Sequence, residues 1–118
     1  MLYFSYYYDG ILEYEGEYLK GQKNGKGKEY YENGKLKFDG EYLNGKIWNG
    51  KGYNKNGNIE YEIKDGKGYI KEYDTDDKLI FEGEYLNGKR WNGKGKEYNY
   101  NKNSMIELEY INGKKSLK

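Results

Sequence analysis

One pattern recurs along almost the whole chain and constrains its fold more than any other feature. An aromatic residue, a glycine and a second aromatic residue stand at alternate positions in three full copies. The copies are Tyr14-x-Gly16-x-Tyr18, Phe38-x-Gly40-x-Tyr42 and Phe81-x-Gly83-x-Tyr85. Self-similarity at a period of about 20–50 residues is the signature of a repeat architecture, in which each unit packs mainly against its neighbours. We therefore expect one domain, residues 1–118, built from stacked copies of a small unit.

The repeat divides the chain into four units and two partial ones. The four units span 12–35, 36–58, 59–78 and 79–105, with partial units at 1–11 and 106–115. The third unit departs from the pattern, because it lacks the segment that precedes the Gly-Lys-Gly run in its neighbours and has Ile63 where they have Gly40 and Gly83. We expect a shortened hairpin and a local change of twist or bend there.

Each unit carries two strand signals. Period-2 alternation places Leu12, Tyr14, Gly16 and Tyr18 on one face of a strand and the intervening glutamates on the other. A second signal is the run that begins at Gly25, with counterparts that begin at 50, 66 and 93. The glycines of the first strand suggest a packing use, since a missing side chain leaves room for an aromatic ring from the neighbouring strand.

Turn dipeptides separate these strands. Asn-Gly or Asp-Gly stands at 9–10, 24–25, 33–34, 44–45, 49–50, 56–57, 65–66, 87–88, 92–93 and 112–113. These pairs tolerate the positive φ that a type I′ hairpin turn requires. The sequence therefore predicts an all-β fold, an elongated single-sheet antiparallel meander of stacked β-hairpin repeats, with a length of roughly 45 Å.

Composition limits the chemistry that such a sheet can perform. The chain has no Cys and no His, which removes thiolate metal ligands, the commonest metal ligand and the commonest general base. Its 21 basic and 20 acidic residues give a net charge of +1, so nothing favours nucleic acid as a partner. No apolar run approaches the roughly 20 residues that span a bilayer. We expect a cytoplasmic protein that can associate with a membrane surface, without catalytic residues, metal or cofactor.

The string YEGEYLKGQKNGKGKEYYENG at residues 14–34 resembles the MORN (membrane occupation and recognition nexus) repeat. The resemblance recurs at 38–52 and 81–95 and, through partial copies, covers nearly the whole chain. It implies an elongated sheet of stacked hairpins, and roles in scaffolding, self-association, membrane-proximal placement and phosphoinositide binding. The phrase YYENGKL at 30–36 is also similar to a bacterial antitoxin-like subgroup of such repeats.

Several residues are candidates for binding rather than for catalysis. The repeated carboxylates, such as Glu15 and Glu17, fall on the predicted solvent face, where ion pairs with cross-strand lysines are expected. The lysine of each Gly-Lys-Gly run could meet an anionic headgroup, and this set is Lys26, Lys51, Lys67 and Lys94. Aromatic residues near the predicted turns are candidate anchors for a protein partner, or caps of the core, and this set is Trp48, Trp91, Tyr42 and Tyr85.

The two ends of a meander differ in their capacity to self-associate. An edge strand has unpaired backbone groups, and lysines discourage pairing of such an edge. The C-terminal edge is followed by Lys114 and Lys115, whereas the N-terminal edge carries no charge before Asp9. Phe4, Tyr6 and Tyr8 mark that N-terminal edge as a candidate for a homodimer contact.

Two functions follow from these features. The first is a non-catalytic repeat scaffold that mediates protein–protein interaction or self-association. The second is a peripheral membrane module that binds anionic phospholipid headgroups. Basic side chains that cluster on one edge would favour the second function, and an exposed aromatic strip without such clustering would favour the first.

Overall fold

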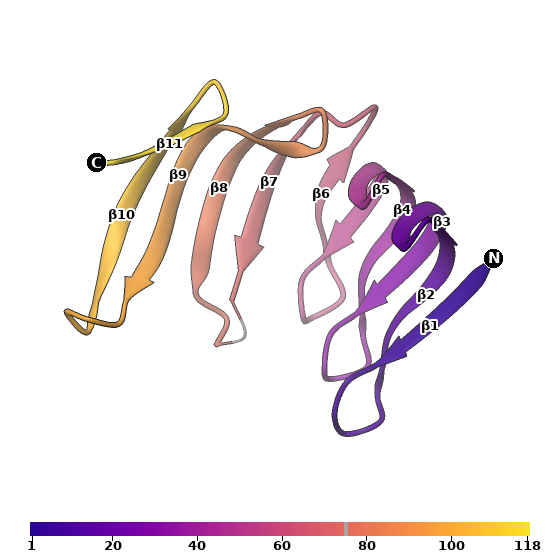
Figure 1. The fold of residues 1–118 in the computed structure, drawn as a ribbon. Helices are drawn as coiled ribbons and strands as arrows, with labels where there is room; N and C mark the ends of the chain where they lie inside the picture. The colour runs from indigo at the N-terminus through magenta and orange to yellow at the C-terminus, as the bar shows by residue number, and fades with distance from the viewer. Residues whose placement is uncertain (75) are drawn as a thin grey trace.

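The computed structural model describes residues 1–74 and 76–118, and across these residues it contains β-strands and no helix (Figure 1). The all-β prediction is confirmed. The strands are β1 (Leu2–Tyr6), β2 (Leu12–Leu19), β3 (Gln22–Tyr30), β4 (Leu36–Leu43), β5 (Lys46–Tyr53), β6 (Ile59–Ile63), β7 (Gly68–Tyr73), β8 (Leu79–Leu86), β9 (Lys89–Asn99), β10 (Ser104–Ile111) and β11 (Lys114–Leu117). Each strand pairs antiparallel with its sequence neighbours, except at one point.

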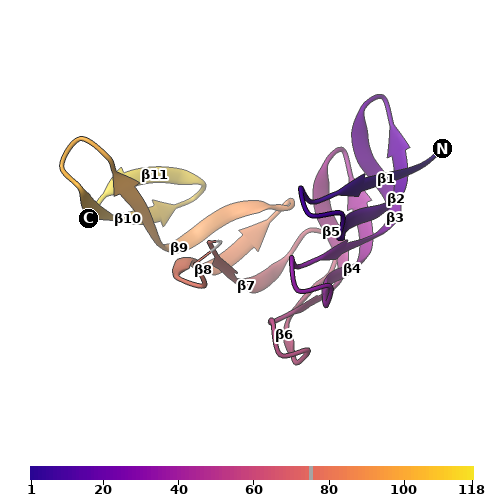
Figure 2. The ribbon, with the colours of Figure 1, turned by 90° about the horizontal axis from the view of Figure 1, so that it is seen from below.

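The exception divides the meander into two sheets. One sheet has the order β1-β2-β3-β4-β5-β6 and the other β7-β8-β9-β10-β11. The prediction of a single sheet is therefore wrong. The strands of the two sheets lie at an angle to each other (Figure 2), and the molecule measures 41 × 32 × 30 Å, only slightly longer than it is wide.

The sheet breaks within the shortened third unit, where a bend was expected. β6 and β7 have five and six residues, against eight each in β4 and β5 of the preceding unit. The turn between β6 and β7 is closed by a bridge from Lys64 to Lys67, and the strands diverge from it (Figure 1). Ile63 and Ile70 are both buried in one core cluster, against which Tyr85 of the second sheet also packs. The two sheets therefore fold toward each other over these side chains.

Five tight turns join strands at one end of the sheets. They are Lys20-Gly21, Asn44-Gly45, Asp65-Gly66, Asn87-Gly88 and Asn112-Gly113, and both residues of each pair have positive φ, as type I′ turns require. Three predicted turns, at 24–25, 49–50 and 92–93, lie instead inside β3, β5 and β9. There the register of each strand with its partner shifts, so these dipeptides lie at irregularities within strands and not in turns.

The core is a thin layer of aromatic and aliphatic side chains on one face of each sheet. Tyr14, Phe38 and Phe81 are almost fully buried. Neighbouring rings meet edge to face, as Phe38 does with Tyr42, whose centroid is 5.4 Å away, and this is a preferred geometry for aromatic pairs. Among the described residues, three of the eight buried hydrophobic side chains are tyrosines, in a chain that is only 35% hydrophobic.

Glycine makes this thin core possible, although partly in another way than the sequence predicts. A Cβ at Gly27 would overlap the Tyr14 ring, and one at Gly93 would lie 3.0 Å from Cζ of Phe81. At Gly40 and Gly83, however, the closest atoms belong to the backbone of the neighbouring strand, at Asn49 and Asn92. The expectation that these two glycines make room for a ring is therefore wrong, because they allow two backbones to approach.

Candidate functional site

The N-terminal edge strand offers the clearest apolar surface. β1 pairs with β2 along one side, and no strand of the described residues lies along its other side. Tyr3 stacks on Tyr18 at a centroid distance of 4.3 Å, which fixes β1 to the core face. On the same strand Leu2, Phe4 and Tyr6 are 67%, 50% and 61% exposed. The candidates Phe4 and Tyr6 thus lie on the edge strand, whereas the fully exposed Tyr8 lies in the turn that follows it.

A shallow hollow of about 450 Å³ adjoins this edge. Leu2 and Phe4 form one wall, and the backbone of a row of glycines, Gly16, Gly27 and Gly40, forms the floor. These glycines are directly opposite one another in successive strands. Charged side chains from β2, β3 and β4 form the rest of the rim. An apolar edge next to a concave floor is a surface that another chain can cover.

The C-terminal edge is different. β11 has four residues, two of which are Lys114 and Lys115. The Lys115 ammonium pairs with Glu97 at 2.6 Å, and hydrogen bonding to that carboxylate raises the pKa of the lysine. A short edge strand that carries lysines is a poor template for pairing with another strand.

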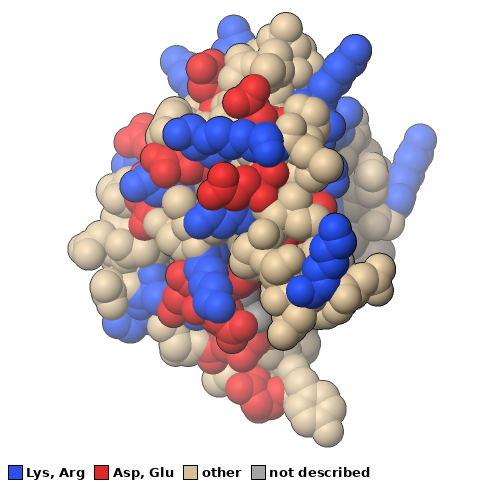
Figure 3. Space-filling model, turned by 90° about the vertical axis from the view of Figure 1, so that its left-hand side faces the viewer, with Lys and Arg blue, Asp and Glu red and all other residues tan. Residues whose placement is uncertain are grey.

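The candidate lipid-binding lysines are exposed but sit among carboxylates. In the strand register Lys26 is opposite Glu41, and Lys51 is opposite Asp39 on one side and Glu62 on the other. Lys94 likewise stands between Glu82 and Glu109, while Lys67 belongs to the turn between the sheets. The face in Figure 3 shows the same mixture of acidic and basic side chains. The structure therefore does not gather these four lysines into one basic patch.

Trp48 and Trp91 connect successive tight turns. Each is the unpaired residue at a register shift, in β5 and β9 respectively. The carbonyl oxygen of Trp48 accepts a hydrogen bond from Gly66 N–H at 2.9 Å, and that of Trp91 accepts one from Gly113 N–H at 2.8 Å. The Trp48 ring also lies against Gly66, and the Trp91 ring lies against Gly113. Both rings are half-buried, so they support the neighbouring turn and leave only part of their area to a partner.

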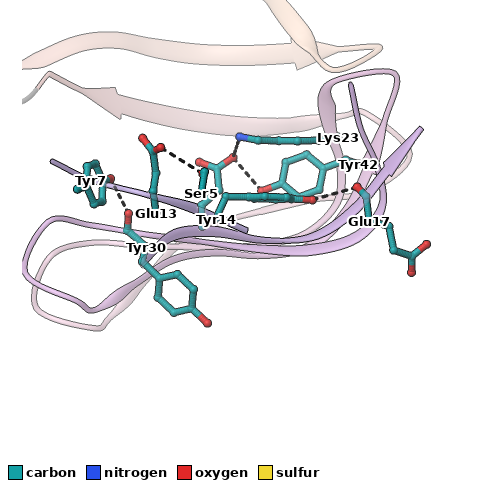
Figure 4. Close-up of polar contacts among 9 residues, drawn as sticks. Ser5, Tyr7, Glu13, Tyr14, Glu17, Lys23, Tyr30 and Tyr42 are labelled. Atoms are coloured by element: carbon teal, nitrogen blue, oxygen red, sulfur yellow. Dashed lines mark hydrogen bonds and ion pairs between the residues drawn. The ribbon is translucent and has the colours of Figure 1, made fainter. Parts of the chain in front are cut away.

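Tyr42 and Tyr85 belong to the core and to a polar network on its surface. Tyr42 is 4% exposed, which leaves it no surface to offer a partner. Its hydroxyl donates to Glu29 at 2.8 Å, and the Lys23 ammonium reaches the same carboxylate at 3.0 Å. Figure 4 shows Lys23 beside the Tyr42 ring. Burial, and then the negative charge of Glu29, raise the pKa of Tyr42.

The second sheet repeats this network with an arginine. The Tyr85 hydroxyl donates to Glu72 at 2.6 Å, thirteen residues away as in the pair Glu29 and Tyr42. Arg90 pairs with Glu72 through two hydrogen bonds and donates to the Tyr110 hydroxyl at 2.8 Å. Although burial alone lowers the pKa of Arg90, the hydrogen bonds and charge of Glu72 raise it overall. These groups are engaged with each other and form a structural network.

A groove of about 750 Å³ opens where the two sheets separate. Residues from β4 to β8 line it, together with residues from the turns at both ends of these strands. Its walls include six tyrosines, namely Tyr7, Tyr31, Tyr53, Tyr61, Tyr73 and Tyr85. Glu60 also lines the groove, and one of its carboxylate oxygens is buried with no hydrogen-bond partner among the described residues.

Sequence reasoning missed both the groove and the core-face carboxylates. Alternation from Gly25 and Gly27 places Glu29 on the core face of its strand. The sequence Lys-Glu-Tyr recurs at 28–30 and 71–73, and this recurrence indicates that Glu29 and Glu72 occupy equivalent positions. The groove depends on a break between strands that hydrophobic patterning does not encode.

Within residues 1–74 and 76–118 no cluster of acidic side chains could hold a metal ion. Over the same residues no helix is long and apolar enough to cross a membrane. Comparisons with protein-family models, with curated proteins and with solved structures gave no match.

Proposed function

We propose that the protein is a non-catalytic repeat scaffold of the MORN type, which acts in the cytoplasm and associates with a second copy of itself through β1. The exposed, uncharged edge of β1 carries this proposal. Leu2, Phe4 and Tyr6 present apolar area beside unpaired backbone groups, whereas the opposite end of the meander is short and basic.

The proposed dimer is built from two β1 strands. Two such edges pair antiparallel about a two-fold axis, because this symmetry closes the assembly and gives both copies the same contacts. The pairing joins two six-stranded sheets into one and covers Leu2 and Phe4 of each copy.

The test is the solution mass of the intact chain at about 0.1 mM, measured by static light scattering. We expect a dimer, and we expect Phe4→Lys and Tyr6→Lys to convert it to a monomer, since lysines discourage edge pairing. Leu117→Lys is the matched control, because it places the same charge on β11, where Leu117 is also exposed. A monomeric parent chain, or a dimer that ignores both β1 substitutions, would exclude this edge as the interface.

The alternative function, binding of anionic phospholipid headgroups, has less support in the geometry. It requires the Gly-Lys-Gly lysines to act together, and Lys26, Lys51 and Lys94 each stand opposite carboxylates. Opposite charges at such spacing largely cancel beyond a Debye length of about 8 Å at physiological salt.

A further inference from the structure

The two strands that border the sheet break have facing edges that are not joined. Lys64 and Lys67 exchange both backbone hydrogen bonds, each 2.9 Å long. In an antiparallel pair the backbone groups two residues further along point the same way, so Glu62 and Tyr69 would form the next rung. No ladder pairing joins β6 to β7 in the described residues. Further from the turn, Glu60 of β6 and Lys71 of β7 both line the groove, whereas the Glu62 carbonyl oxygen lies close to Gly68.

Core packing keeps these edges apart. Ile70 is 1% exposed and also lines the groove, and Tyr61 and Tyr85 pack against the same core cluster from the two sides. To close the ladder, β6 and β7 would have to displace these side chains. An unpaired polar backbone group away from water is costly, so an extended segment that pairs with the edges gains backbone hydrogen bonds without disturbing the core.

The side chains of the groove define the chemistry of that segment. The Glu60 carboxylate has one oxygen that is buried and without a donor. A hydrogen bond to Glu60, and secondly burial, raise the pKa of Tyr73 to about 12, so this hydroxyl stays neutral. Four lysines line the groove, namely Lys37, Lys46, Lys55 and Lys71, and of these Lys55 is paired with Asp77 at 2.8 Å. A buried acceptor without a donor is unfavourable, and tyrosine faces attract cations.

We propose that this groove binds an extended peptide segment of about five residues that carries a lysine or arginine side chain. The segment matches the lengths of β6 and β7, which have five and six residues. It lies antiparallel to β7, the more stable of the two orientations, and its cationic side chain reaches Glu60. The proposal goes beyond the dimer formed by β1 and does not depend on it.

A blocked pentapeptide of alternating valine and lysine is the probe. Two matched peptides serve as controls, one with glutamate in place of lysine and one with methylated backbone nitrogens at the lysines. Trp48 contacts Gly66 in the turn that joins β6 and β7, and it follows Ile47, which lines the groove, so its fluorescence in the Trp91→Phe variant reports binding. Protection of the Lys71 amide from hydrogen exchange locates the peptide, because Lys71 lines the groove.

We expect saturable binding of the lysine peptide, at least about ten-fold weaker binding of each control peptide, and protection of the Lys71 amide. Glu60→Gln should weaken binding of the lysine peptide by a similar factor. Glu13→Gln is the matched control variant, because Glu13 is the unpaired residue at the corresponding register shift in the first unit. It should bind as the parent chain does.

Three results would overturn the proposal. One is equal affinity for the lysine, glutamate and methylated peptides, and another is the absence of saturation up to about 1 mM. The third is binding that Glu60→Gln and Glu13→Gln change equally. The peptide measurements are repeated with Phe4→Lys added, which removes the proposed β1 contact, so failure of the β1 dimer and failure of this site are distinguishable.

Discussion

Arg90 on β9 reaches over the intervening strand β8 to form a bidentate ion pair with Glu72 on β7. The Nε–Oε2 and Nη2–Oε1 distances are 2.9 and 3.1 Å, and the guanidinium carbon lies 4.9 Å from the centre of the Phe81 ring beneath it. One side chain thus connects three strands of the second sheet. The corresponding cation in the first sheet is Lys23, 4.7 Å from the centre of the Tyr14 ring.

Arg90→Lys should therefore lower the free energy of unfolding by about 1–2 kcal/mol. Lysine keeps the charge but loses the planar fork that makes two parallel hydrogen bonds to a carboxylate. Denaturant unfolding of the two chains measures the difference. Lys115→Met is the control, because it removes an exposed ion pair of the same sheet and should leave the unfolding midpoint unchanged. Equal effects of the two substitutions would contradict the role given to Arg90.

Gly40→Val should destabilise the fold by at least about 2 kcal/mol. The Cβ would overlap the carbonyl oxygen of Asn49, and a neighbouring backbone cannot move aside as a flexible side chain can. Lys51→Ala, at an exposed position of the adjacent strand, should change stability by less than about 0.5 kcal/mol. Chemical denaturation of both variants tests the assignment of the two faces, and the reverse order would refute it.

The sequence predicts the strands and their faces well because both depend on local alternation. Tyr14, Phe38 and Phe81 were placed on the core side from their spacing alone, and all three are buried. Turn positions were less predictable. Asn24-Gly25 and Asn44-Gly45 look alike in sequence, but only the second has positive φ at both residues. The difference arises because Lys20-Gly21 already closes the first hairpin, which leaves Asn24 inside β3.

The candidate surfaces also differ in how well the sequence predicts them. The exposed apolar edge of β1 could be read from uncharged residues before Asp9. The burial of Tyr42 beneath the Lys23–Glu29 pair could not, because it depends on how two side chains of β3 lie over a ring of β4. The groove at Glu60 likewise arises from a missing pairing between β6 and β7, a long-range property of the sheets.

Stability should decrease as the pH rises from 10 toward 12. Burial raises the pKa of Tyr14 to about 12, and burial followed by a hydrogen bond to Glu15 raises that of Tyr30 to about 12, both from 10.0. Above pH 10 the unfolded chain therefore binds fewer protons than the folded chain, so deprotonation favours unfolding. This contribution to stability is complete below pH 10 and is lost as the pH passes through the folded pKa.

Tyrosinate absorbance and circular dichroism, recorded together against pH, measure this effect. We expect a first group of tyrosines to ionise without loss of structure and a second group to ionise together with unfolding. Tyr14→Phe should move the unfolding transition to higher pH, because one group that opposes folding when ionised has been removed. A single tyrosine titration near pH 10 with the strands intact would contradict the prediction.

Liposome sedimentation should give no binding to neutral vesicles and only weak, salt-sensitive binding to anionic ones. The reason is the register, which places Lys94 between Glu82 and Glu109 and Lys51 between Asp39 and Glu62. The variant Glu82→Gln with Glu109→Gln frees Lys94 from its carboxylates and should bind anionic vesicles more strongly than the parent chain. The same two substitutions should not affect neutral vesicles. Binding by the parent chain that survives about 0.5 M salt, where screening acts within a few ångströms, would instead indicate a specific headgroup pocket.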